Sequence, residues 1–357
     1  LHHRRFDCVH FYHQSSPLPP DIEPSLRRPL EMMNFHLSYQ WLFYTKPPPG
    51  PPSPVPDGLE RYWIDTPQGK LEILSAAPPK TVTASDGPPI YFCHGGMGCA
   101  WVWTEYMQYL AARGVRSYAI SLRGHGDSWY PSYFRMLFGT SRRMLSDDLI
   151  AGLRWVEQRE KRRVVLVGHS SGGGLSQGVL SEGRVDVEGL ALLGAVPGYG
   201  SMGVYMNWMK LDPWFGLRLI FHGYHSNSPL SHPILTQRVF FGDKFPLSAV
   251  IPFQRRMNRY ESYLWPFSMM RPFAPARSVL QHIHHGRMLV MAGSQDKIMT
   301  PQITTKTAAY YSEASAGICG AGSVRMELVE GAGHHLQNDI QWEDGAAKLW
   351  DFYKSIS

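Results

Sequence analysis

An apolar, β-branched run ends abruptly at a pair of serines between glycines, GHSSG at residues 168–172. Residues 164–167 predict a buried strand, and residues 173–180 predict a helix that follows almost at once. Such a sharp strand-to-helix turn is crowded, so the glycines two residues before and after its centre are needed because they lack a Cβ atom. The turn lifts the central Ser170 above the sheet, beside a helix N-terminus that stabilises negative charge. The pattern therefore predicts a nucleophilic serine.

From residue 58 onward, short apolar strands alternate with helices. Strands are predicted over residues 59–67, 69–77, 88–96, 115–122, 164–170, 187–196, 287–293 and 324–331. Helices are predicted over residues 103–113, 146–159, 173–180, 302–313 and 342–354. The first two strands are expected to form a hairpin, and strands that alternate with helices pair in parallel. The predicted fold class is therefore α/β, with a doubly wound, mostly parallel sheet.

One long interval, residues 198–284, interrupts this alternation and is rich in aromatic residues, methionine and proline. Because proline ends helices, the interval predicts short helices and bends that form a helical cap inserted before the penultimate strand. The core is then divided into residues 58–197 and 285–357. Six cap residues are candidates for an apolar substrate pocket above Ser170, and at least two of them are expected to line it: Trp208, Trp214, Phe215, Trp265, Met269 and Met270.

Residues 1–57 form an N-terminal extension in which proline is dense near residues 17–20 and 47–56. Between these stretches a helix is predicted over residues 30–44, because apolar side chains recur on one helical face: Leu30, Met33, Leu37, Trp41 and Tyr44. The helix would pack on the main domain or on a second copy of the chain. It lacks the basic polar face of a membrane-surface helix. A homodimer through the extension or the cap is one expected assembly.

Composition and charge argue against several classes of function. The net charge of +6 comes from scattered Lys and Arg, and the basic clusters at 161–163 and 255–256 lack the interleaved aromatic residues of nucleic-acid binders. The sequence has no run of 18 or more apolar residues, so no segment is expected to span a membrane. The chain has four cysteines, which is typical of a protein with free thiols in a reducing compartment rather than of a disulfide-stabilised one. The visible N-terminus lacks an apolar signal core, so a cytoplasmic location is expected, with a removed signal left open.

A nucleophilic serine needs a histidine base and an acid that orients the base. In this architecture they are expected on loops after later strands, in the order Ser, Asp, His. Asp296 follows the strand at 287–293, whereas no acidic residue directly follows the strand at 187–196. His334 lies on a glycine-lined loop after the last strand, next to its competitor His335. His334 is preferred because it directly follows a glycine.

The oxyanion of an acyl-transfer intermediate needs two N–H donors. The backbone N–H of Ser171 is one candidate, and the loop CHGGMG at 93–98 supplies the other, with Gly96 preferred and Met97 next. His94 in that loop is expected to be a structural, hydrogen-bonded histidine. The turn RGHGDS at 123–128 is expected to shape the floor of the site.

These motifs occur together in an order that resembles the α/β-hydrolase fold superfamily, of the type with an inserted cap. The resemblance covers about residues 58–355 and rests on HGG at 94–96, RGHGDS, GHSSGG, SQD at 294–296 and GAGH at 331–334. It implies that Ser170 is the nucleophile, His334 the base and Asp296 the orienting acid. Relatives that open epoxides or remove halides carry aspartate at the nucleophile position, so the serine here disfavours that chemistry.

The function predicted is a serine hydrolase that cleaves an ester or lactone of a mid-sized apolar compound, with no cofactor. The same triad could instead hydrolyse carbon–carbon bonds or thioesters, or act as a lyase, and a non-enzymatic ligand-binding receptor is a further alternative. No metal is predicted. The cluster His282, His284 and His285 resembles a metal site, but its short run contains no Asp, Glu or Cys.

Overall fold

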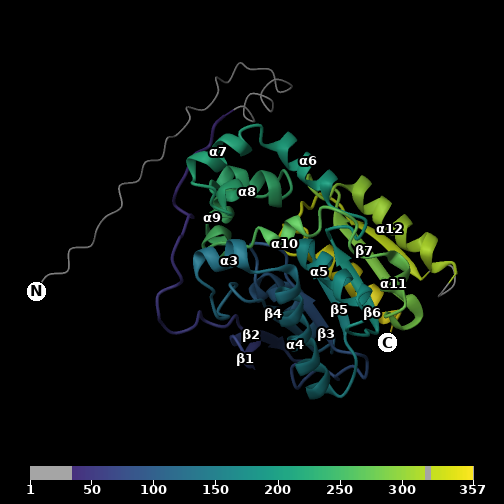
Figure 1. Ribbon diagram of the computed structural model, residues 1–357. Coiled ribbons are helices and arrows are strands. Elements are labelled where there is room, and N and C mark those ends of the chain that lie inside the picture. Colours follow the sequence, from purple (N-terminus) through teal and green to yellow (C-terminus); the bar gives the residue numbers. More distant parts are fainter. Residues whose placement is uncertain (1–33, 318–322, 357) are drawn as a thin grey trace, which may run out of the picture.

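The computed structural model describes residues 34–317 and 323–356, and its centre is a twisted β-sheet (Figure 1). Within the described residues the sheet has eight strands in the order β1-β2-β4-β3-β5-β6-β7-β8. The strands are β1 (Leu59–Thr66), β2 (Gly69–Ala76), β3 (Ile90–Cys93), β4 (Ser117–Ser121), β5 (Val165–His169), β6 (Gly189–Leu193), β7 (Met288–Gly293) and β8 (Val324–Val329). The strand β2 pairs antiparallel with both β1 and β4, and every later pair is parallel. The predicted α/β fold with a mostly parallel sheet is confirmed.

Alternate residues of the central strands face opposite sides of the sheet, and both sides are covered by helices. On β5, Val165 and Val167 belong to one buried cluster and Leu166 to the other. One face is covered by α4 (Arg142–Glu160), α5 (Ser170–Ser181) and α12 (Pro301–Ser315). The opposite face is covered by the short helix η1 (Ala100–Trp103), α2 (Thr104–Ala111) and α13 (Trp342–Lys354). The apolar sequences of β3, β6 and β7 follow from this burial on both faces.

Short helices fill the interval between β6 and β7, which we call the insert (residues 198–284). They are α6 (Met202–Leu211), α7 (Phe215–Phe221), η2 (Ser228–Leu230), α8 (Pro233–Phe240), α9 (Leu247–Arg256), α10 (Leu264–Phe267) and α11 (Ala276–Leu280), with η3 (His284–Gly286) at its end. Proline stands at the start of α8, where its missing N–H is not needed. The helices α6 to α9 gather at one end of the sheet (Figure 1).

The helix expected over residues 30–44 is not formed in its described part. Residues 34–44 have no helical structure and lie along the insert (purple in Figure 1). The Arg218 Nε donates to the backbone oxygen of His36 at 2.6 Å, and the ring of His225 is 2.8 Å from the backbone oxygen of Phe43. A helix would need such carbonyl groups for its own hydrogen bonds, so contacts with the insert outweigh the local apolar pattern. Leu30 and Met33 lie outside the described residues.

Two other local differences concern helices in the first part of the core, residues 58–197. The helix α3 (Tyr133–Gly139) was not expected from the sequence, and α4 begins at Arg142, where Ser141 caps it by accepting the N–H of Met144 at 3.3 Å.

Within the described part of the chain, no helix is both long and apolar enough to cross a membrane.

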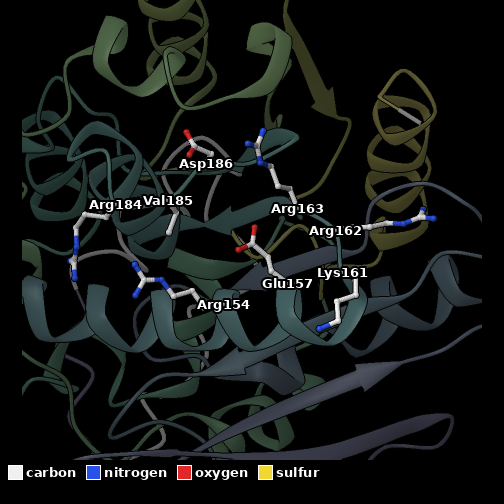
Figure 2. A pocket seen from close by; sticks show the side chains of 8 residues that line it. All are labelled: Arg154, Glu157, Lys161, Arg162, Arg163, Arg184, Val185 and Asp186. Carbon is white, nitrogen blue, oxygen red and sulfur yellow. The ribbon is translucent and has the colours of Figure 1, made fainter.

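A polar cleft of about 430 Å³ lies at the end of α4, beside the start of β5 (Figure 2). Its lining is mostly basic: Arg154, Glu157, Lys161, Arg162, Arg163, Arg184, Val185 and Asp186. The side chains of Arg154, Arg162 and Arg163 point in different directions, so they do not converge on one point (Figure 2). Ser170 follows the opposite end of β5. The cleft is therefore remote from the predicted nucleophile.

Candidate active site

The turn at residues 168–172 has the tight geometry that its glycines predict. The strand β5 ends at His169 and α5 begins at Ser170, whose φ of 51° is in the left-handed region. A Cβ on Gly172 would lie 2.0 Å from the backbone oxygen of His94, and one on Gly168 would lie 2.6 Å from the Cα of Gly173. The backbone of a non-glycine residue with such a positive φ is strained, and strained residues of this kind are common at functional sites.

We expect Gly172→Ala to destabilise the fold. The new methyl group would overlap a backbone oxygen that cannot move without shifting β3, and overpacking of this kind costs about 1–3 kcal/mol. The matched control is Gly203→Ala, because a Cβ there meets nothing within 4 Å. Thermal unfolding of both variants checks the prediction: the midpoint should fall for the first and hold or rise for the second. Equal midpoints would contradict the packing argument.

Ser170, His334 and Asp296 are joined in one chain of hydrogen bonds. The Ser170 Oγ is 2.9 Å from the Nε2 of His334, and the Nδ1 of His334 is 2.7 Å from the Oδ2 of Asp296. The other carboxylate oxygen of Asp296 accepts the N–H groups of Ile298 at 3.0 Å and Met299 at 2.8 Å. The carboxylate is buried, and its orientation is fixed by these backbone donors. This arrangement can move a proton from a serine hydroxyl to an imidazole.

His335 has a different environment from its neighbour. Its ring packs on Phe240, with ring centroids 4.4 Å apart, and on Phe253 at 5.0 Å. Burial, together with the nearby His334, lowers the pKa of His335 to about 3, so the ring is neutral. Its backbone N–H donates to the oxygen of Phe240 at 2.7 Å. His334 therefore lies within hydrogen-bond distance of Ser170, whereas His335 packs against aromatic rings of the insert.

Asp339 holds the loop that carries both histidines, a role that the sequence analysis missed. Its Oδ2 accepts the N–H of Gly333 at 2.8 Å and the N–H of Gly242 at 2.7 Å. Because Gly242 belongs to the insert, one buried carboxylate fixes the insert to the residue before His334. A buried acid that accepts two backbone N–H groups has no local sequence signature.

The glycine loop after β3 approaches the serine closely. A Cβ on Gly95 would lie 2.7 Å from the Cβ of Ser170. The Gly96 N–H donates to the Oγ of Ser171 at 2.6 Å. The Met97 N–H donates instead to Glu261 Oε2 of the insert, at 3.0 Å. Gly96 therefore presents its N–H beside the serine pair, while that of Met97 is held by the insert.

Five of the six apolar insert residues singled out in the sequence are divided between two places. Trp265 and Met269 are buried in the main core, where the ring of Trp265 is 6.2 Å from that of His125 and Met269 packs against Gly174 of α5. Trp208 and Phe215 pack together at 6.4 Å, and Trp214 packs on Phe35 at 5.8 Å. Met270 is half-buried.

Phe240 was not singled out, yet its ring lies 6.0 Å from the ring of His334. It is the last residue of α8, which places an aromatic side chain of the insert beside His334. One phenylalanine among the many aromatic residues of this interval gives no distinct signal in the sequence.

The histidines at 282–285 pair with carboxylates that are distant in the sequence. His282 Nδ1 lies 2.9 Å from Asp186, and His284 Nδ1 lies 2.8 Å from Glu188. The parallel bridge between Val187 and Ile283 brings the two segments together. These are partly exposed pairs on the protein surface.

Comparisons with known proteins agree with this architecture. A thermophilic esterase from Thermogutta terrifontis matches with a TM-score of 0.59 at 16% identity, covering 83% of this chain and 99% of the esterase. The 2-hydroxy-6-oxo-6-phenylhexa-2,4-dienoate hydrolase of Rhodococcus sp. strain RHA1 matches with a TM-score of 0.55 at 17% identity, over 83% and 99%. An enol-lactonase from Burkholderia xenovorans LB400 matches with a TM-score of 0.57 at 14% identity, over 82% and 100%.

At these identities the structural matches establish the fold. The family match is made by the sequence itself: a family model described as an alpha/beta hydrolase family matches residues 90–347. That range includes Ser170, Asp296 and His334, and it confirms the resemblance stated from the motifs. The chain belongs to the alpha/beta hydrolase family.

Proposed function

We propose that the protein is a serine hydrolase that cleaves an ester or lactone of a mid-sized apolar compound. Ser170 Oγ attacks the substrate carbonyl while His334 Nε2 takes the hydroxyl proton, and Asp296 stabilises the imidazolium that forms. The N–H groups of Gly96 and Ser171 stabilise the tetrahedral oxyanion. His334 then protonates the leaving alcohol, and water releases the acyl group by the same route.

The observation that carries this proposal is the continuous hydrogen-bond chain from Ser170 through His334 to Asp296. A hydrogen-bonded serine, histidine and aspartate also occur by chance on protein surfaces. Here the aspartate and the histidine are buried, and the serine is in the strained turn that opens α5. Together these features support a nucleophile with a base and an orienting acid.

The apolar character of the substrate is proposed from the insert, which we take to act as a cap over the core formed by residues 58–197 and 285–357. Phe240 packs on His334, and Phe253 packs on His335 and on Trp101 at 5.2 Å. Aromatic surface of the insert therefore lies beside the base. A substrate that reaches Ser170 next to such rings gains by burying apolar area.

A substrate panel tests the proposal. Initial rates are measured on p-nitrophenyl acetate, butyrate and octanoate, an aliphatic lactone, an acyl thioester and a β-diketone, with Ser170→Ala as the blank. We expect ester or lactone turnover, with kcat/KM rising about fourfold for each added methylene that is buried, since each contributes about 0.8 kcal/mol. Turnover of the β-diketone alone would favour carbon–carbon bond hydrolysis. Turnover of none would contradict the proposal.

A further inference from the structure

An acidic residue of the insert is buried against the glycine loop. Glu261 lies between α9 and α10, and its side chain is 7% exposed. Its Oε2 is 2.8 Å from His125 Nε2, while its Oε1 accepts the N–H of Ser262 at 2.8 Å. His125 belongs to the RGHGDS turn after β4, so this contact joins the insert to the core.

The hydrogen-bond partners of Glu261 and His125 fit an ion pair. The Nδ1 of His125 is 2.8 Å from the backbone oxygen of Arg123, which can only accept, so Nδ1 carries a proton, and Nε2 also carries one when it faces the ionised carboxylate of Glu261. Burial by itself lowers the pKa of His125, but Glu261, together with the backbone oxygen of Arg123 and the charge of Asp148, raises that pKa above its usual value. Burial by itself raises the pKa of Glu261, but His125, together with the backbone N–H groups of Met97 and Ser262, holds it below its usual value.

The same turn of the insert holds both polar groups of the Met97 backbone. The Met97 N–H donates to Glu261 Oε2 at 3.0 Å, and the Asn258 N–H donates to the Met97 oxygen at 3.2 Å. Met97 has a φ of 66°, which costs a non-glycine residue about 1 kcal/mol or more unless its surroundings fix it. These two hydrogen bonds fix the peptide groups on either side of Met97.

Fixing Met97 also fixes the residue before it. The peptide that joins Gly96 to Met97 carries the N–H that Glu261 accepts, so its plane is set by the insert. Gly96 has no side chain to hold it, and its own N–H points to the Ser171 Oγ at 2.6 Å. The carbonyl of the Gly95–Gly96 peptide is held by His94 Nδ1 at 2.7 Å, so the core and the carboxylate of the insert together set the direction of the Gly96 N–H, which must meet the oxyanion.

We infer that Glu261, paired with His125, is a positioning residue that assembles the oxyanion hole by holding the Gly96–Met97 loop. This inference rests on the proposed hydrolase function. It assigns the insert a part in the chemistry: when the turn at residues 256–262 is docked, the Gly96 N–H is aligned, and when the carboxylate is missing the loop can turn away from the oxyanion.

Four variants test the inference. Glu261→Ala removes the acceptor of the Met97 N–H, while Glu261→Gln keeps an oxygen of nearly the same position without the charge. Because removing one member of a buried pair can unfold a protein, the double variant Glu261→Met/His125→Leu replaces both charges with apolar groups. The matched control is Asp212→Ala, which breaks the buried pair of the insert with Arg218, away from the glycine loop.

Each variant is assayed on the best ester of the panel and with an alkyl trifluoromethyl ketone, which binds serine hydrolases as a tetrahedral oxyanion. Removing an oxyanion donor lowers kcat by about 10²–10³-fold, and misalignment should cause a smaller loss of about 10- to 100-fold in Glu261→Ala and in the double variant. The KM should change by less than about threefold, and inhibition by the ketone should weaken in step with kcat/KM. Glu261→Gln should fall between Glu261→Ala and the natural protein.

The control separates positioning from stability. Asp212→Ala should lower the thermal midpoint yet keep kcat and ketone binding near those of the natural protein. The inference is overturned if Glu261→Ala keeps full kcat and full ketone inhibition, or if kcat in all variants simply follows the thermal midpoint. Failure of the proposed function would look different, because the unaltered protein itself would then hydrolyse no ester or lactone.

Discussion

Replacing Ser170 with alanine should lower kcat by about 10⁴-fold or more, because a triad without its nucleophile keeps only the contribution of substrate binding and the oxyanion hole. The side chain is half-exposed at the start of α5, and its hydroxyl bonds to His334. Removing one oxygen there leaves the core clusters intact. Thermal unfolding and circular dichroism should therefore match those of the natural protein while turnover is lost.

The neighbouring serine provides the comparison. Ser171→Ala removes a hydroxyl one residue away and keeps the backbone N–H of residue 171, so turnover should remain measurable. If Ser171→Ala abolished turnover and Ser170→Ala did not, the assignment of the nucleophile would be wrong.

The second large effect is expected for Asp296→Asn, with a loss of about 10³–10⁴-fold in kcat. The Oδ1 of Asp296 accepts the N–H groups of Ile298 and Met299. An asparagine must keep its oxygen in that position, so its NH₂ group would face His334 Nδ1. The imidazole would then carry its proton on Nε2 and could not accept the proton of Ser170.

Steady-state kinetics on the same ester checks this effect, with Asp147→Asn as a control that removes an exposed carboxylate on α4. The Asp296 variant should keep its KM and its thermal midpoint, since the asparagine has the same size. Activity within about threefold of the natural protein would contradict the assignment, because replacing the orienting aspartate of a triad costs far more. It would mean that another carboxylate orients the base.

The sequence predicted those features that depend on local pattern. Buried parallel strands are read from uninterrupted runs such as residues 164–167, and the glycines at 168 and 172 are required by contacts of 2.6 and 2.0 Å that any Cβ would make. Because the carboxyl ends of parallel strands meet at one edge, the loops after β5, β7 and β8 could be expected to meet as well. The hydrogen bonds of Ser170, His334 and Asp296 follow from that arrangement.

The features that sequence analysis missed depend on contacts between distant segments. Glu261 and Met97 are 164 residues apart in the sequence, and no sequence pattern in either segment indicates that they form a hydrogen bond. Residues 34–44 have the periodicity of a helix, but the insert takes up their carbonyl groups. The single charged residue in the aromatic-rich stretch at 260–270 was a hint, since a buried charge needs a partner.

The central claim, that Ser170 is the nucleophile of a serine hydrolase, is tested most directly by covalent labelling. The full chain is incubated with an alkyl fluorophosphonate, digested, and the labelled peptide sequenced by mass spectrometry. We predict one phosphonyl group on Ser170, absent in Ser170→Ala, present in Ser171→Ala and strongly reduced in His334→Ala, because the base must remove the hydroxyl proton. No adduct, or an adduct on Ser171 or another residue, would contradict the claim.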